Sequence, residues 1–132
     1  MLDSTVLILL ERNGTEPGRL AAMHDEELLI TAVSISELQF GFHRAADEIQ
    51  RQTRKAFMSS VLETFHILPF DVEAALIHGR VWADLSASGQ RIGVQDSIIA
   101  AIALANDHAV MTDNVREFSR VIGLELRPVS LP

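Results

Sequence analysis

The sequence has no cysteine, a single lysine and no long apolar run, and each absence excludes a class of structure. Without cysteine the chain forms neither a disulfide nor a thiolate zinc site. No apolar segment approaches the ~20 residues that a membrane helix needs. The first residues, MLDSTVLILL, lack the basic lead-in of a signal peptide. We therefore expect a cytoplasmic protein that makes no contact with membranes.

Basic residues and histidine motifs are scarce as well. Eleven lysine and arginine residues stand against 18 acidic ones, which gives a net charge of −7 at pH 7. That balance argues against nucleic-acid binding through overall charge, although a locally basic RNA site is compatible with it. The five histidines show no H-x-x-x-H metal spacing. What the chain does have is 48% hydrophobic residues among 132, which suits one folded domain over residues 1–132.

Short apolar runs alternate with amphipathic segments along the whole chain. Strands are predicted for residues 1–4, 28–33, 66–70, 109–114 and 124–129. Helices are predicted for residues 5–14, 16–27, 34–46, 47–65, 72–89, 93–109 and 115–121, with Asp71 as the cap of the fifth. Strands separated by helices indicate an α/β fold with a mostly parallel sheet.

The stretch ITAVSISELQFG places the carboxylate of Glu37 between a predicted strand and an apolar helix. Ser34 and Glu37 fit the S-x-x-E capping box, in which each side chain binds a backbone N–H of the other residue. Glu37 is then a structural residue at the start of a helix. The alternative is that the same helix aims Glu37 into a cleft, and the two roles are compatible.

Four carboxylates fall near predicted strand ends or helix starts, where open parallel sheets bind their ligands. They are Asp3, Glu37, Asp96 and Asp113. Asp96 also suits a helix dipole and Asp113 a turn, so each has a structural alternative. Asp3 lies in a predicted buried strand with no basic residue near it in sequence, which makes a metal ion a reasonable partner. Clustered carboxylates favour Mg²⁺ or Mn²⁺, ions that activate water for phosphodiester cleavage.

Four segments carry a family resemblance, and they span nearly the whole chain: LDSTVL, AVSISELQFG, VQDSIIAAIALANDHAVMTDNVREF and GLEL. Together they resemble the landmark segments of PIN-domain ribonucleases and are most similar to VapC-type toxins of bacterial toxin–antitoxin pairs. The resemblance implies a three-layer αβα domain with a central, mostly parallel sheet of four to five strands. It also implies an acidic metal site that cuts RNA.

By this resemblance the catalytic site and the ligands of Mg²⁺ or Mn²⁺ are expected among five residues. They are Asp3, Glu37, Asp96, Asp113 and Asn114. Three more are expected to support them: Ser4, Thr112 and Glu117.

Two positions depart from the family pattern. The family usually has DTN after its first strand, whereas this chain has Asp3-Ser4-Thr5, with threonine in place of asparagine. At the TDN corner, Asn114 takes the ligand position and Asp113 the variable one. The fourth ligand is thus Asp113, Asn114 or a water held by Glu117.

The implied activity is that of a metal-dependent endoribonuclease toxin acting on structured RNA, with tRNA as the expected substrate. A VapB-type antitoxin is expected to cover the cleft, and a homodimer is expected as well. The apolar run from Val6 to Leu10 exceeds one helix face, which also favours an oligomer interface.

The most basic part of the chain, residues 44–55, contains Arg44, Arg51 and Arg54. These arginines either form a solvated helix face or bind RNA phosphates beside the site. Trp82 is expected in the core or in an interface.

Two other classes of function stay open. One is phosphotransfer through an aspartyl-phosphate on Asp3, which is weakened because position 5 is threonine rather than a second aspartate and because Lys55 is the only lysine. The other is a non-catalytic α/β module that binds a partner. Metal-dependent nuclease activity distinguishes all three.

Overall fold

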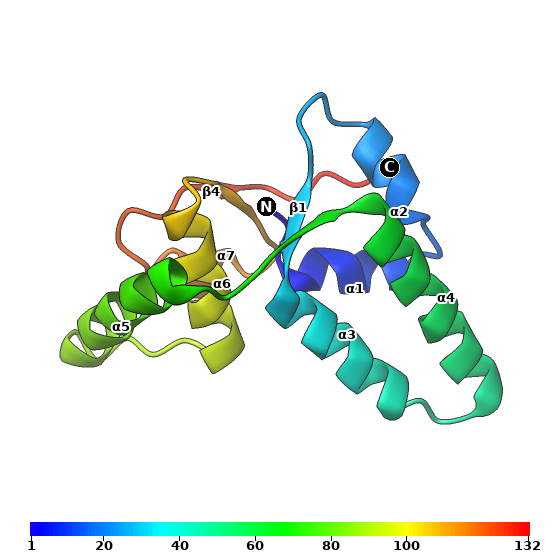
Figure 1. The fold of residues 1–132 in the computed structure, drawn as a ribbon, viewed down its shortest axis with the longest axis horizontal. Helices are drawn as coiled ribbons and strands as arrows, with labels where there is room; N and C mark the ends of the chain where they lie inside the picture. The colour runs from blue at the N-terminus through cyan, green and yellow to red at the C-terminus, as the bar shows by residue number, and fades with distance from the viewer.

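The computed structural model describes residues 1–132, with short strands between two groups of helices (Figure 1). In chain order the elements are α1 (Ser4–Arg12), α2 (Pro17–Ala22), β1 (Leu29–Thr31), α3 (Ala32–His43), α4 (Glu48–Thr64), β2 (His66–Leu68), α5 (Val72–Ala87), α6 (Val94–Ala105), β3 (Val110–Met111), α7 (Val115–Phe118) and β4 (Leu126–Arg127). This succession confirms the predicted α/β class.

The strands form two parallel pairs, β1 with β2 and β3 with β4. The N-terminal segment lies between the pairs. The Leu2 N–H donates to the Leu29 carbonyl at 2.7 Å, and the Asp3 N–H donates to the Met111 carbonyl at 2.9 Å. A single bridge between Leu2 and Met111 is the only ladder contact that this segment makes.

The predicted central sheet of four to five strands is not confirmed, because the regular strands form two separate pairs that only the N-terminal segment connects. The reason lies in the connections. Helix α1 begins at Ser4 and α3 begins at Ala32, directly after the strand-like residues Leu2 and Thr31. The chain leaves the sheet before a longer ladder can form.

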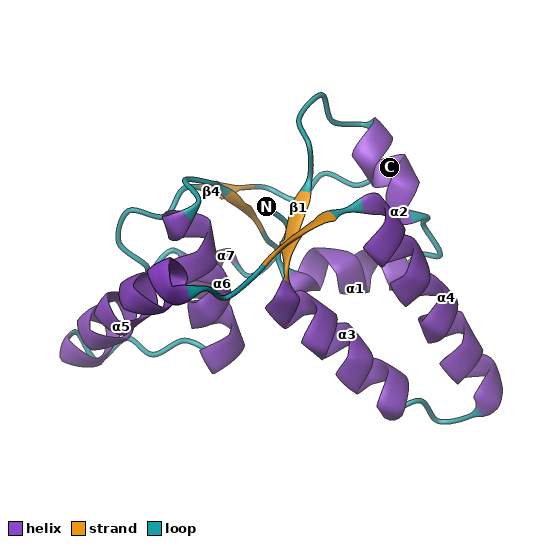
Figure 2. Ribbon diagram, in the orientation of Figure 1, coloured by secondary structure: helices purple, strands orange, loops and turns teal.

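Helices cover both faces of the strands (Figure 2). Leu2 and Met111 belong to a core shared with α1, α2, α3 and α4. Val110, adjacent to Met111, belongs to a second core shared with α5, α6 and α7. Successive side chains of a strand point to opposite faces, so one strand supplies both cores.

Several element boundaries differ from the prediction. Helix α2 ends at Ala22 rather than at residue 27, and the exposed run Asp25-Glu26-Glu27 follows it. Negative charge at a helix C-terminus opposes the helix dipole, which explains the early end. The Asp71 cap of α5 is confirmed, because its carboxylate accepts a hydrogen bond from the Ala74 N–H at 2.9 Å.

The capping box predicted at Ser34 and Glu37 is wrong. Helix α3 begins two residues earlier, and its N-cap is Thr31, whose hydroxyl accepts a hydrogen bond from the Ser34 N–H at 3.3 Å. Glu37 therefore lies in the second turn of α3, beyond the positions that need a cap.

The apolar run from Val6 to Leu10 is mostly internal. Val6, Leu7 and Leu10 are fully buried in the first core, and only Ile8 reaches an exposed fraction of 36%. This run therefore gives no support for an oligomer interface. No helix combines the length and apolarity that a bilayer span requires.

Candidate metal and active site

Asp3 sits at the junction of the N-terminal segment and α1, and its side chain is only 1% exposed. Its Oδ1 accepts a hydrogen bond from the Ser4 N–H at 2.7 Å. Its Oδ2 accepts two, from the hydroxyls of Thr5 and Thr112, both at 2.8 Å. Asp3 forms no ion pair, so its charge is held by hydrogen bonds alone.

The expected supporting residues Ser4 and Thr112 both lie at this junction. The Thr112 hydroxyl also accepts a hydrogen bond from the Asn114 N–H at 2.9 Å, which ties the end of β3 to Asp3 across 109 residues of sequence. The Ser4 hydroxyl lies 2.9 Å from that of Ser34 and so links α1 to α3. Thr5 was seen in the sequence only as a departure from the family, yet its hydroxyl binds Asp3 directly.

Glu37 faces the same junction from α3. Burial raises the pKa of its carboxyl, the Ser4 hydroxyl lowers it, and the negative charge of Asp3 raises it further. Its Oε2 is buried and has no hydrogen-bond partner. A buried carboxylate oxygen without a partner is costly, so this atom is suited to a ligand that the protein itself does not supply.

Asp96 enters from the first turn of α6, as the sequence predicted. Its pKa is raised to about 7, first by burial and then by the negative charges of Asp3, Glu37 and Glu117. A hydrogen bond from the Asn114 amide nitrogen to Asp96 Oδ2, at 3.2 Å, lowers the pKa of Asp96. Four carboxylates from four separate segments therefore act on one another through space.

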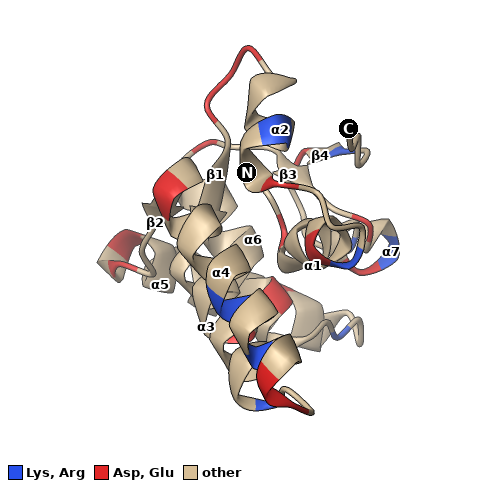
Figure 3. Ribbon diagram, turned by 90° about the vertical axis from the view of Figure 1, so that its right-hand side faces the viewer, with Lys and Arg blue, Asp and Glu red and all other residues tan.

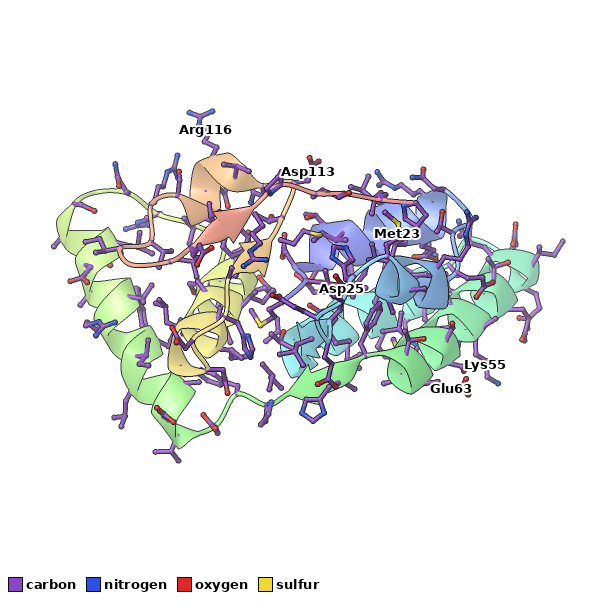
Figure 4. The ribbon with its side chains drawn as sticks, turned by 90° about the horizontal axis from the view of Figure 1, so that it is seen from above. Met23, Asp25, Lys55, Glu63, Asp113 and Arg116 are labelled. Atoms are coloured by element: carbon purple, nitrogen blue, oxygen red, sulfur yellow. The ribbon has the colours of Figure 1, made fainter.

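The residues that follow β3 include the candidates for a fourth ligand, and their surroundings differ. The Asn114 amide nitrogen also donates to Glu117 Oε2 at 3.2 Å, so that it holds Glu117 beside Asp96. Asp113, labelled in Figure 4, is exposed, and its carboxylate forms no hydrogen bond or ion pair with another residue. The structure thus brings Glu117, and not the carboxylate of Asp113, to the other acids.

The donor set fits a hard divalent ion in its chemistry. The acids raise one another's pKa, one buried oxygen lacks a partner, and no lysine or arginine is paired with Asp3, Glu37 or Asp96. In the side-chain conformations of the structure, no three acidic or histidine side chains are gathered closely enough to hold one ion. Ion binding therefore requires the carboxylates to rotate toward one another.

The three arginines expected to bind RNA have different surroundings. Arg51 pairs with Glu48 on the same helix at 3.1 Å, and the Arg44 guanidinium lies over the Phe40 ring at 5.8 Å. Arg54 lies 3.7 Å from Glu11 and lines the same groove as Glu37. The basic residues of α4 lie in the middle of the helix, with acidic Glu48 and Glu63 towards its ends (Figure 3).

Comparison with known proteins gives full-length matches. Residues 1–124 match the model of the PIN domain family. Ribonuclease VapC1 of Rickettsia felis is 32% identical over 130 residues, which are 98% of this chain and 96% of that protein. The tRNA(fMet)-specific endonuclease VapC of Salmonella typhimurium is 27% identical over 127 residues, which are 96% of this chain and 94% of that one.

A solved structure has the same fold. A chain in the crystal structure of DNA-bound VapBC from Salmonella typhimurium superposes with a TM-score of 0.87 at 26% sequence identity. The match covers 97% of this chain and 96% of that chain. The short strands and flanking helices described above are thus shared along nearly the full length of both chains.

Proposed function

Since the chain belongs to the PIN domain family, in which it groups with VapC-type proteins, we propose that it is a metal-dependent endoribonuclease toxin. The observation that carries the proposal is the convergence of Asp3, Glu37, Asp96 and Glu117, from segments far apart in sequence, without a balancing cation. Such a cluster is unfavourable unless a cation occupies it. The full-length relatives named as ribonucleases support the reaction class.

Asp3, Glu37 and Asp96 would hold Mg²⁺ or Mn²⁺, and Glu117 would complete the set directly or through a water. When bound, the ion would lower the pKa of a water that attacks the phosphodiester and would stabilise charge on the phosphate. Thr5 and Thr112 fix the orientation of Asp3 by donating to its Oδ2. Asn114 fixes Asp96 and Glu117 in the same way through its amide nitrogen.

We propose structured RNA, and tRNA in particular, as the substrate. The support is the Salmonella typhimurium relative, whose name specifies tRNA(fMet), together with its match to 96% of this chain. An acidic protein needs local rather than overall basic charge to hold RNA, and Arg54 beside Glu37 offers one such contact.

A VapB-type antitoxin is the proposed partner, supported by the VapBC complex among the solved structures. A groove of about 410 Å³ between α1, α3 and α4 leads to Glu37 and carries the exposed apolar side chains of Ile8 and Phe40. An antitoxin segment lying in this groove would block access of RNA to the carboxylates. The homodimer stays a prediction, and light scattering that gives the 14.6 kDa monomer at micromolar concentration would refute it.

Phosphotransfer is disfavoured by the surroundings of Asp3. Both of its carboxylate oxygens accept hydrogen bonds, and its side chain is 1% exposed. Residue 5 is a threonine bound to Asp3 rather than a second aspartate, and no lysine or arginine is paired with this carboxylate to hold a phosphoryl group.

The test is cleavage of total tRNA by the purified, partner-free chain in Mg²⁺ or Mn²⁺. Wild type is expected to yield discrete fragments, whereas EDTA and Asp96→Asn abolish them. Glu63→Gln is the matched control, because it removes one exposed negative charge from α4, on the side of the molecule away from Asp113 (Figure 4). An absence of cleavage by wild type on total RNA as well as tRNA would reject the proposal.

A further inference from the structure

Trp82 is the only tryptophan of the chain, and the structure leaves it 66% exposed on α5. The sequence suggested a core or interface position for this residue. A large aromatic side chain gains most of its stabilisation from burial, so its exposure gives no benefit to the fold. An exposed tryptophan is typical of surfaces that bind a ligand or a partner, so the surroundings of this indole matter.

A cavity of about 370 Å³ lies beside this indole, between α5 and the start of α6. Leu85 and Ile92 provide apolar walls. The ring of His78 lies 6.0 Å from that of Trp82, at an interplanar angle of 36°, so that two tilted aromatic faces border the space. The His78 Nε2 is held 3.0 Å from the Ser97 hydroxyl, which fixes the imidazole at the edge of the cavity.

The cavity adjoins the carboxylate site on the first turn of α6. Val94 and Ser97 line the cavity, and Asp96 lies between them in sequence. Neighbouring residues of a helix point in directions about 100° apart. In the first turn of α6, Asp96 therefore faces the other carboxylates while Ser97 lines the cavity. Asp96 and the cavity thus share the first turn of α6.

The rim of the cavity carries positive charge. Arg91 lines it, and the Arg120 guanidinium donates to the Arg91 carbonyl at 2.6 Å. Neither arginine forms an ion pair with a carboxylate. Arg91, whose backbone Arg120 holds in place, puts one guanidinium group without an ion-pair partner beside the aromatic rings, which suits a ligand that has both a flat ring and a phosphate.

We propose that this cavity binds one nucleobase of the RNA substrate beside the cleaved phosphodiester, with the base stacked on Trp82 and a phosphate on Arg91. The inference deepens the proposed ribonuclease function and rests on it. Stacking on an aromatic ring accepts any base, so the subsite positions the strand rather than reading its sequence. A second copy of the chain fits less well, because a two-fold contact centred here would bring the arginines of both copies together.

The lone tryptophan gives a direct measurement of binding that does not depend on cleavage. Wild type in EDTA is titrated with adenosine 5′-monophosphate, which has no internal phosphodiester, and with ribose 5-phosphate as the control without a base. We expect the nucleotide to quench the emission of Trp82 and the sugar phosphate to leave it unchanged. Equal responses to the two ligands would overturn the proposal, as would emission that changes only with protein concentration, the sign of a second copy at this face.

Variants then connect the cavity to RNA cleavage. Trp82→Ala is expected to raise KM for RNA on the order of 10-fold with little change in kcat, whereas Trp82→Phe retains most of the affinity because it keeps an aromatic face. Leu76→Ala is the control, since Leu76 is 74% exposed on the same helix and does not line the cavity. An unchanged KM in Trp82→Ala would reject the base subsite while the nuclease stands. Quenching by the nucleotide without RNA cleavage by wild type would reject the nuclease while the base-binding cavity stands.

Discussion

Asp3 shows how a charged residue is kept inside this protein. Its carboxylate accepts three hydrogen bonds, from one backbone N–H and two hydroxyls, so that its burial is compensated without a basic partner. Thr5 takes part although it differs from the family pattern, because a hydroxyl at that position reaches the same carboxylate oxygen. The threonine at this position thus supplies one of the three hydrogen bonds that hold Asp3.

The corner residues give the first prediction. Glu117→Gln and Asn114→Ala are each expected to lower kcat for RNA cleavage about 10-fold or more, because Glu117 completes the carboxylate set and Asn114 positions two of its members. Asp113→Asn is expected to change kcat less than 3-fold, since its side chain is exposed and Asp113 is not among the charges that raise the pKa of Asp96 or Glu37. Single-turnover cleavage of tRNA by the three variants measures this, and a loss confined to Asp113→Asn would contradict it.

The second prediction concerns the pH dependence of stability without metal. The pKa of Asp96 is about 7 in the folded protein, against 3.8 for the free side chain. At pH values between these two, the Asp96 carboxyl is therefore mostly protonated in the folded state and mostly ionised in the unfolded state. The resulting contribution to the free energy of unfolding is complete below about pH 4 and is lost as the pH rises through 7. Asp96→Asn removes this titration, so the variant gains stability relative to wild type as the pH rises.

Urea unfolding in EDTA at pH 5 and pH 8 measures the effect. The expected gain of Asp96→Asn over wild type between the two pH values is about 1 kcal/mol, well below the full value of the shift because solvent screens a half-buried carboxyl. An equal difference between the two proteins at both pH values would refute the raised pKa of Asp96, which burial and the neighbouring acids together produce. Glu63→Gln is the control, because Glu63 is exposed on α4 and away from the cluster.

At the scale of the element, the start of α3 decides where Glu37 points. Thr31 ends β1 and caps α3 at the same time, so the helix begins directly at the sheet. Ser34, which the sequence pattern marks as the cap, is instead buried within the first turn and lies against Ser4. Because Glu37 has no capping task, its side chain is free to face Asp3 and Asp96.

The third prediction tests this cap. Thr31→Val keeps the shape of the buried side chain and removes the hydroxyl that accepts from the Ser34 N–H, so we expect the free energy of unfolding to fall by about 1 kcal/mol. Thr31→Ser keeps the hydroxyl and should lose less. Chemical denaturation measures the free energy of unfolding of both variants. A Thr31→Val protein as stable as wild type would show that Thr31 does not cap α3 and would favour Ser34 as the cap.

At the scale of the whole molecule, the carboxylate site is also a junction between parts of the fold. Asp3 joins the N-terminus, Glu37 belongs to the side of α1, α3 and α4, and Asp96 belongs to the side of α5 and α6 (Figure 1). Each group of helices has its own core. An ion bound by all three residues would therefore hold the two groups together.

The fourth prediction follows from that position. Mn²⁺ at 100 times its Kd should stabilise the folded chain by about 2.7 kcal/mol, because the ion binds the folded state and not the dispersed carboxylates of the unfolded one. A thermal-shift titration measures this, and Asp3→Asn and Asp96→Asn should abolish most of the shift. If those two variants responded as strongly as wild type, the ion would be bound elsewhere.

The sequence by itself determined the α/β class, the order of the helices and the identity of Asp3, Glu37 and Asp96 as candidates. Each of these depends on local periodicity or on short motifs, which are properties of neighbouring residues. The Asp71 cap was predictable for the same reason, since a cap is formed within one turn of its helix.

Only the tertiary structure decided the rest. The start of α3 depends on where β1 ends, and β1 ends where its partner β2 does. The choice of Glu117 over Asp113 depends on which side chain faces α6, and the exposure of Trp82 depends on which helix covers α5. These are contacts between segments distant in sequence, and local patterns do not encode the direction in which one segment meets another.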